Sequence, residues 1–255
     1  MSVSVLADSQ TIDWLMAGDP VIPWQTMRDL LDRPEKEWEA ERQKITKTGW
    51  GAEFLSHQRP DGTWPLGRWT DTTWTLLLLM DAGIPKEIPS ISEAVERTIC
   101  KWLPKEGPSD PRILLSRVDV CHLGFWLRFG SYFLGEDRRM AGLAHTLMTV
   151  QFPDGGWNCR KRNHPETHHS SFHTTFNVLD GLRAARDSRL LGSIHFRIIE
   201  AQAMGFMLAH QMYRSDKTGH VIDEKFTHLA YPSHWRYIVL RGLDYMRSTP
   251  EIRDD

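Results

Sequence analysis

The chain has 255 residues with a hydrophobic fraction of 40%, which is enough to build the core of one large domain. Its 31 basic and 33 acidic residues give a net charge of −2, so the composition provides no electrostatic attraction for nucleic acid or for an anionic membrane. No secretory signal opens the chain, and the longest apolar run, residues 76–80, is far too short to span a bilayer. We therefore expect a cytoplasmic protein with no nucleic-acid partner and no transmembrane segment.

The numbers of cysteines and tryptophans indicate which kinds of site and packing the protein contains. The three cysteines, Cys100, Cys121 and Cys159, are odd in number and far apart, which argues against a disulfide framework and favours metal-binding or core roles. Cys100 lies on a polar helical segment beside Trp102, and we expect it in the core. The 11 tryptophans are many for this length and predict a wide apolar wall or pocket.

Helical segments follow one another along the chain, and no stretch shows the alternation that is typical of a strand. Some are apolar around most of their circumference, which indicates helices buried on all sides. These apolar segments are residues 71–82, 118–134, 172–185 and 235–246. More polar helices are expected at 35–46, 91–102 and 190–211, and further helical stretches at 51–57 and 140–150.

A seven-residue motif occurs twice and separates two helices each time. Gln-Arg-Pro-Asp-Gly-Thr-Trp at residues 58–64 recurs as Gln-Phe-Pro-Asp-Gly-Gly-Trp at residues 151–157. Pro-Asp-Gly favours a tight turn because Pro fixes φ and Gly accommodates a positive φ. We expect both glutamines to bond to neighbouring backbone and both tryptophans to pack against a helix.

Alternating buried and polar helices predict two concentric layers, an inner ring of parallel helices and an outer ring that returns the chain. This is an all-α architecture of the α/α-toroid type, expected here as a single domain over residues 1–255 whose ring is short or open. Because the inner helices run parallel, their N-termini meet at one mouth of the barrel. The mouth is expected to gather Asp71, the cluster at residues 119–122, His173 and His234.

The mouth collects the residue types that bind zinc. Asp119 and Cys121 stand two positions apart at the start of one apolar helix, and His173 starts the next one. Cys159 lies on the loop between these helices. Three protein ligands with an open position are typical of catalytic zinc. The sequence therefore predicts a zinc site formed by Asp119, Cys121 and His173, with Cys159 as the candidate fourth ligand.

The repeated Gln-x-x-Asp-Gly-x-Trp motif resembles the QW motifs of squalene and oxidosqualene cyclases, and the same helix–turn–helix unit occurs in protein prenyltransferase β subunits. The resemblance covers roughly residues 49–250 and implies the toroid fold. The zinc motif of the prenyltransferase β subunits, an Asp-x-Cys pair followed by a His inside Phe/Tyr-His-Thr, is similar to residues 119–121 and 172–174. The resemblance thus implies zinc at these positions.

The chain also departs from both families. Prenyltransferase β subunits have basic residues three and six positions before the Asp, where this chain has Ser116 and Ile113. The Asp-x-Asp-Asp acid of squalene cyclases is absent from the sequence. Retention of zinc is therefore better supported than prenyl-diphosphate chemistry.

Asp71 and His122 are the candidate catalytic acid–base groups. The candidate substrate-binding residues are aromatic side chains expected to line the barrel cavity, where π faces stabilise cations. They are Trp74, Trp126, Phe176 and Trp235. The main hypothesis is a zinc-dependent, terpenoid cyclase-like or prenyltransferase-like enzyme acting on an isoprenoid or other apolar substrate. The alternative is a non-catalytic toroid with a structural zinc site that binds a lipid or a protein partner; a homo-oligomer is also left open.

Three histidines between Cys159 and His173 are expected to lie in solvent. His164, His168 and His169 belong to a strongly polar segment, so an exposed loop is favoured over metal binding. His210 and His220 flank a turn at residues 215–219 and have no evident set of partners.

Overall fold

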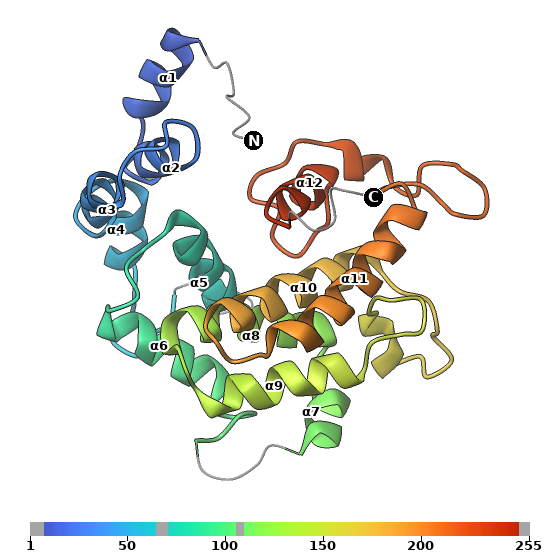
Figure 1. Ribbon diagram of the computed structural model, residues 1–255. Helices are drawn as coiled ribbons and strands as arrows, with labels where there is room; N and C mark the ends of the chain where they lie inside the picture. The colour runs from blue at the N-terminus through green and yellow to red at the C-terminus, as the bar shows by residue number, and fades with distance from the viewer. Residues whose placement is uncertain (1–7, 65–70, 106–109, 250–255) are drawn as a thin grey trace. The chain divides into compact units, whose positions relative to one another are not determined.

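The computed structural model describes residues 8–64, 71–105 and 110–249, with Asp71 and Ser193 described by their backbone alone. Within these ranges the chain is helical and has no named strand, so the all-α expectation is confirmed for them (Figure 1). The helices are α1 (Ser9–Met16), α2 (Val21–Asp29), α3 (Glu35–Arg42), α4 (Gly49–Ser56), α5 (Asp71–Ala82), α6 (Pro89–Ile99), α7 (Pro111–Arg117), α8 (Val120–Leu134), α9 (Arg138–Thr149), α10 (Phe172–Asp187), α11 (Ser193–Ala209) and α12 (Val239–Arg247), with 3-10 segments η1 (Gln43–Thr46), η2 (Cys159–Arg162) and η3 (Glu224–Thr227). No helix of this described part is long and apolar enough to cross a membrane.

The chain divides into two compact units, Met1–Thr98 and Ile99–Asp255, and each is described by itself. A single domain over residues 1–255 stays a prediction. The apolar helices expected from residues 71 and 172 begin at those residues, as α5 and α10. Helices α1, α2 and α7 were not foreseen, although Asp110 followed by Pro111 is a recognisable start: the Asp110 carboxylate accepts a hydrogen bond from the backbone N–H of Arg112.

The last expected inner helix differs most from its prediction. It starts at Val239 because the backbone at Ile238 is still extended. It is also not buried on all sides, since Leu240 is 52% exposed and Leu243 is 53% exposed. Another correction concerns Cys100, which is exposed and not part of the core.

The repeated motif adopts the same hydrogen-bonded turn in both copies, which confirms the expected repeat. Gln58 donates from Nε2 to the carbonyl oxygens of Gly62 and Ser90, at 3.1 and 2.9 Å. Gln151 donates in the same way to Gly155 and Ile199, at 2.6 and 3.0 Å. Each glutamine thereby joins its own turn to the helix that follows the apolar one, α6 in the first unit and α11 in the second.

The tryptophans of the motif are equivalent as well. Trp64 donates from Nε1 to the Phe54 carbonyl in α4, and Trp157 donates to the Leu147 carbonyl in α9. Both side chains are buried. The glycine of each turn, Gly62 or Gly155, has a positive φ of 78° or 99°, as the Pro-Asp-Gly sequence predicts.

In the second unit, α8 and α10 lie against each other and run in the same direction (Figure 1). Gly124 and Gly181 allow the close approach: a Cβ on Gly124 would lie 2.4 Å from the carbonyl oxygen of Asn177, and one on Gly181 would lie 2.5 Å from the oxygen of Gly124. The C-terminal ends meet where Ser188 donates from Oγ to the Ser131 carbonyl. The two helices therefore begin at the same end of the unit.

Helix α12 runs in the same direction as α10. The chain just before α12 meets the start of α10, where the Tyr237 backbone N–H donates to His173. Further along both helices, Arg241 pairs with Asp180, and Arg183 donates to the Tyr245 carbonyl. Three helices of this unit thus present their N-terminal ends on one side.

A leucine in place of Gln151 should weaken the second unit. The Gly155 and Ile199 carbonyls would lose their donor in a partly buried turn, which costs about 1–3 kcal/mol of the free energy of unfolding. Urea denaturation measures this loss. The exposed Gln43, whose side chain donates a hydrogen bond to the Glu39 side chain, is the matched control: Gln43→Leu should change stability by less than about 0.5 kcal/mol. Equal effects of the two substitutions would contradict the structural role given to the motif.

Candidate functional site

Two cysteines meet at the start of α8 and α10. Cys121 lies in the first turn of α8, and Cys159 opens the 3-10 segment η2 on the loop before α10. Their sulfur atoms are 3.3 Å apart, and the Cys159 sulfur lies 2.9 Å from Oγ1 of Thr174, in the first turn of α10. Two of the four predicted zinc ligands are therefore neighbours, although 38 residues separate them in the chain.

The shared environment shifts the pKa values of the two thiols in opposite directions. The pKa of Cys159 is lowered because its hydrogen bonds with Cys121, and then with Thr174, stabilise its thiolate. The pKa of Cys121 is raised, first by its hydrogen bond with Cys159 and then by burial. The pair therefore favours one thiolate on Cys159 and one proton on Cys121, which is a nucleophilic and metal-binding form of cysteine.

Asp119 and His122 extend this group on the same helix start. The Asp119 carboxylate bonds to Nε of Arg162 at 2.6 Å through Oδ1. Nδ1 of His122 lies 4.0 Å from Oδ2 of Asp119 and 4.0 Å from the Cys121 sulfur. Burial lowers the pKa of His122 to about 4, so its imidazole is neutral at physiological pH. Asp119, Cys121, His122 and Cys159 thus form a continuous chain of metal-ligating side chains, which we call the Cys–Cys site.

The hydrogen bond of His173 differs from the one that is typical of a zinc-bound histidine. Its Nδ1 accepts a hydrogen bond of 2.8 Å from the backbone N–H of Tyr237, so the proton of the neutral ring is on Nε2. Burial lowers the pKa of His173, which favours this neutral form. A zinc-bound histidine donates from its second nitrogen instead. In this arrangement neither ring nitrogen of His173 has a lone pair free for a metal, and its ring packs against Trp235 and Phe226.

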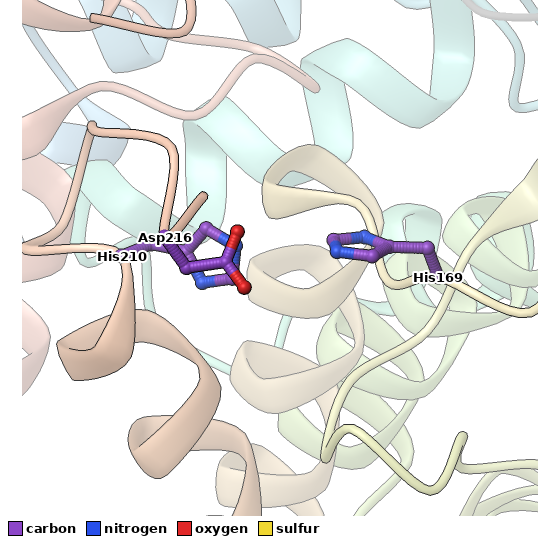
Figure 2. A group of neighbouring side chains, drawn as sticks. All are labelled: His169, His210 and Asp216. Carbon is purple, nitrogen blue, oxygen red and sulfur yellow. The ribbon is translucent and has the colours of Figure 1, made fainter. Parts of the chain in front are cut away.

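Among the described residues, one group of three side chains places its ligand atoms within 4.8 Å of one another: His169, His210 and Asp216. Figure 2 shows the His169 ring directed toward His210 and Asp216. The sequence pattern predicts His169 in solvent and shows no partners for His210. The one available signal was the position of His210 directly after α11 and before a turn that contains an aspartate; nothing in the sequence brings His169, which is 41 positions earlier, to the same point.

The remaining predicted residues are distributed over several environments. Trp126 and Phe176 are buried in the second unit, and Phe176 packs on Tyr237 and Tyr245. Trp235 is 43% exposed and stacks edge-on with His173. Asp71 and Trp74 belong to α5 in the first unit, and the side chain of Asp71 lies outside the described set.

A cavity of about 430 Å³ lies beside the Cys–Cys site. Its wall is largely apolar and includes Leu115, Val120 and Phe152, while Lys161 and Arg162 contribute positive charge. Val120 stands between Asp119 and Cys121, and Arg162 is the ion-pair partner of Asp119. The predicted aromatic residues of this unit, Trp126, Phe176 and Trp235, do not line this cavity.

Comparisons of this chain with protein-family models, with curated proteins and with solved structures find no match. The interpretation of the site therefore rests on its own chemistry.

Cys159 should react with iodoacetamide at a lower pH than an ordinary thiol, because the Cys121 and Thr174 donors stabilise its thiolate. Replacing Cys121 with Ala removes the larger of these contributions and should shift the pH dependence of Cys159 alkylation upward. The measurement is mass-spectrometric quantification of alkylation against pH in chelator-treated protein, normalised to the exposed Cys100 of the same samples. An unchanged Cys159 profile in the Cys121→Ala variant would show that the two thiols are not coupled.

Proposed function

We propose that the Cys–Cys site binds zinc and that the chain is an enzyme acting on an isoprenoid or similarly apolar molecule held in the adjoining cavity. The observation that carries this proposal is the pair of sulfur atoms 3.3 Å apart, with Asp119 and His122 next to them. Thiolate, carboxylate and neutral imidazole are the ligand types of protein zinc sites.

The donor set fits zinc in chemistry, and its two sulfur atoms are close to the spacing that zinc requires. Two sulfurs at about 2.3 Å from a tetrahedral zinc are roughly 3.8 Å apart, so the present pair needs to open by only about 0.5 Å. His122 is the better fourth ligand than His173, because burial keeps its ring neutral and its Nδ1 faces Cys121 and Asp119, each at 4.0 Å, whereas Nδ1 of His173 accepts a hydrogen bond from Tyr237. The proposed ligands are therefore Cys121, Cys159, Asp119 and His122.

We favour a catalytic role in which Asp119 yields its position to water or substrate, because four permanent protein ligands would form a closed structural site and Asp119 is accessible and already bonded to Arg162. The Asp119 and Arg162 side chains are each about one-third exposed, and the apolar cavity opens next to them. When bound, zinc supplies Lewis acidity or an activated thiolate at this position. Arg162 holds the Asp119 carboxylate in place and carries a charge that suits an anionic head group of a ligand.

We also propose the finer architecture, an α/α toroid built from helix–turn–helix repeats. Support comes from two features of the separate units. Each unit contains one copy of the motif with the same glutamine and tryptophan hydrogen bonds. In the second unit, α8, α10 and α12 run in the same direction, as inner helices of such a ring do.

The cavity is of the right size and polarity for an apolar small molecule. Its volume of about 430 Å³ lies within the range of small-molecule pockets, which are mostly apolar with a few polar groups. Lys161 and Arg162 at one side favour a head group that is anionic or polar. Farnesol and farnesyl diphosphate are suitable probes because they share the isoprenoid chain and differ in the charge of the head group.

Zinc binding tests the ligand assignment. Cys121→Ala and Cys159→Ala should each lower the zinc affinity at least 10-fold, and His122→Asn should weaken it as well. His173→Asn should leave the zinc stoichiometry of the folded protein unchanged. The measurements are metal analysis and isothermal titration with zinc, with circular dichroism to confirm folding. Loss of zinc in His173→Asn together with full binding in His122→Asn would reverse the assignment.

Ligand binding and turnover test the rest of the proposal. Ser116 is an exposed residue of the cavity wall, so Ser116→Trp should fill the cavity and reduce farnesol binding, whereas Arg112→Trp on the same helix α7 should not. Loss of turnover in a Cys121→Ala variant that keeps its helical fold would support the proposal. Cooperative unfolding of that variant without zinc, together with no binding of either isoprenoid, would assign the site a structural role.

A further inference from the structure

We propose a second metal site, separate from the Cys–Cys site, in which His169, His210 and Asp216 bind one divalent first-row transition metal. The three residues come from the loop before α10, from the residue that follows α11, and from the turn after it. Their ligand atoms lie within 4.8 Å of one another. The inference does not depend on the proposed function, because it uses none of the residues of the Cys–Cys site.

The histidine protons are on the nitrogens that a metal does not need. Nδ1 of His210 lies 2.7 Å from the Phe206 carbonyl oxygen, and Nδ1 of His169 lies 2.9 Å from the Ser170 carbonyl oxygen. A carbonyl oxygen only accepts, so Nδ1 donates in both rings and each neutral ring keeps its lone pair on Nε2. This is the arrangement of metal-bound histidines, in which a backbone carbonyl or carboxylate fixes the tautomer and the ring orientation.

The distances agree with a shared metal. Nε2 of His210 lies 3.4 Å from Oδ1 of Asp216, and two ligand atoms on a metal with bonds of about 2.0–2.2 Å are roughly 3–3.6 Å apart. Figure 2 shows His169 facing this pair from the opposite side. Two imidazoles and one carboxylate form the ligand set of sites that leave further positions open to water or substrate.

Packing holds the ligands in place before any metal binds. His210 is buried, and its ring lies against Phe206 and Phe172, with ring centres 4.5 and 5.4 Å apart. Asp216 is positioned by its turn, in which Gly219 donates to the Ser215 carbonyl and Ser215 donates to the His220 carbonyl. A prearranged set of three ligands loses less conformational entropy on binding than a flexible one.

The second copy of the repeated motif supports the loop that carries His169. Asp154 accepts hydrogen bonds from the backbone N–H and the hydroxyl of Ser170, at 2.8 and 2.5 Å. In the first copy the equivalent Asp61 accepts hydrogen bonds from the backbone N–H and the hydroxyl of Thr63 in its own turn. The Asp154 carboxylate also lies 3.8 Å from Nδ1 of His169. The turn of the second copy thus orients the residue next to a proposed ligand.

The test uses the full chain with Cys121→Ser and Cys159→Ser, so that thiolate ligands are absent, and titrates it with Co²⁺ and Zn²⁺. We expect one bound equivalent and no cobalt–thiolate charge-transfer absorption. Adding His169→Asn or Asp216→Asn, both at exposed positions, should reduce the affinity at least 10-fold. The neighbouring exposed histidines provide matched controls: His168→Asn and His220→Asn should leave the affinity within about twofold.

Either of two results would overturn the proposal: no metal binding in the Cys121→Ser, Cys159→Ser protein, or binding that is unaffected by both His169→Asn and Asp216→Asn. The first result would mean that only a proton links His210 and Asp216. If the cysteine variant does not fold, crystals of the wild-type protein soaked in Co²⁺ decide the question. An anomalous peak within bonding distance of Nε2 of His169 and His210 supports the site, and its absence there contradicts it.

Discussion

The contact between α8 and α10 determines where the candidate chemistry of the second unit lies. Gly124 and Gly181 bring the two backbones so close that a single Cβ at either position would meet a carbonyl oxygen at 2.4 or 2.5 Å. Because the helices run in the same direction, this contact also places their first turns side by side. Cys121 in one first turn and Thr174 in the other then both reach Cys159 on the loop between them. Helix packing, and not the local sequence, thus brings the thiols together.

Burial and hydrogen bonding then decide which groups can bind a metal. The pKa of His122 is lowered by burial, so the ring stays neutral, and the pKa of Cys159 is lowered by donors to its thiolate. His173 is also neutral, but the Tyr237 backbone N–H occupies its unprotonated nitrogen. In His169 and His210 the Nδ1 atoms face carbonyl oxygens and carry the ring proton, so the unprotonated nitrogen is Nε2. The partner of Nδ1 therefore separates a structural histidine from a candidate ligand.

Much of the local structure could be predicted from the sequence because its causes are local. Apolar periodicity located α5, α8 and α10, and Pro-Asp-Gly with its flanking glutamine and tryptophan predicted the turn of both repeats. The proximity of Cys121 and Cys159 was also within reach, since parallel helices gather their starts. These predictions depend on residues whose preferences act within one or two helical turns.

Other features depend on contacts between distant segments. The role of His173 is set by Tyr237, 64 residues later, and the approach of His169 to His210 depends on how the loop before α10 folds over the end of α11. The apolar residues Leu240 and Leu243 suggested a buried helix, yet α12 leaves both half exposed. Trp126 and Phe176 are buried and do not line the cavity beside the Cys–Cys site, so their role in binding a substrate stays a prediction. Composition alone does not distinguish a packed aromatic residue from one that lines a pocket.

The central claim is that two cysteines and their neighbours form a zinc site at the start of α8 and α10. Zinc K-edge X-ray absorption on protein loaded with one equivalent of zinc tests it most directly, with His169→Asn and Asp216→Asn in place so that the other candidate ligands do not compete. We expect two sulfur neighbours at about 2.3 Å together with two nitrogen or oxygen neighbours at about 2.0–2.2 Å. A zinc coordination shell without sulfur would contradict it.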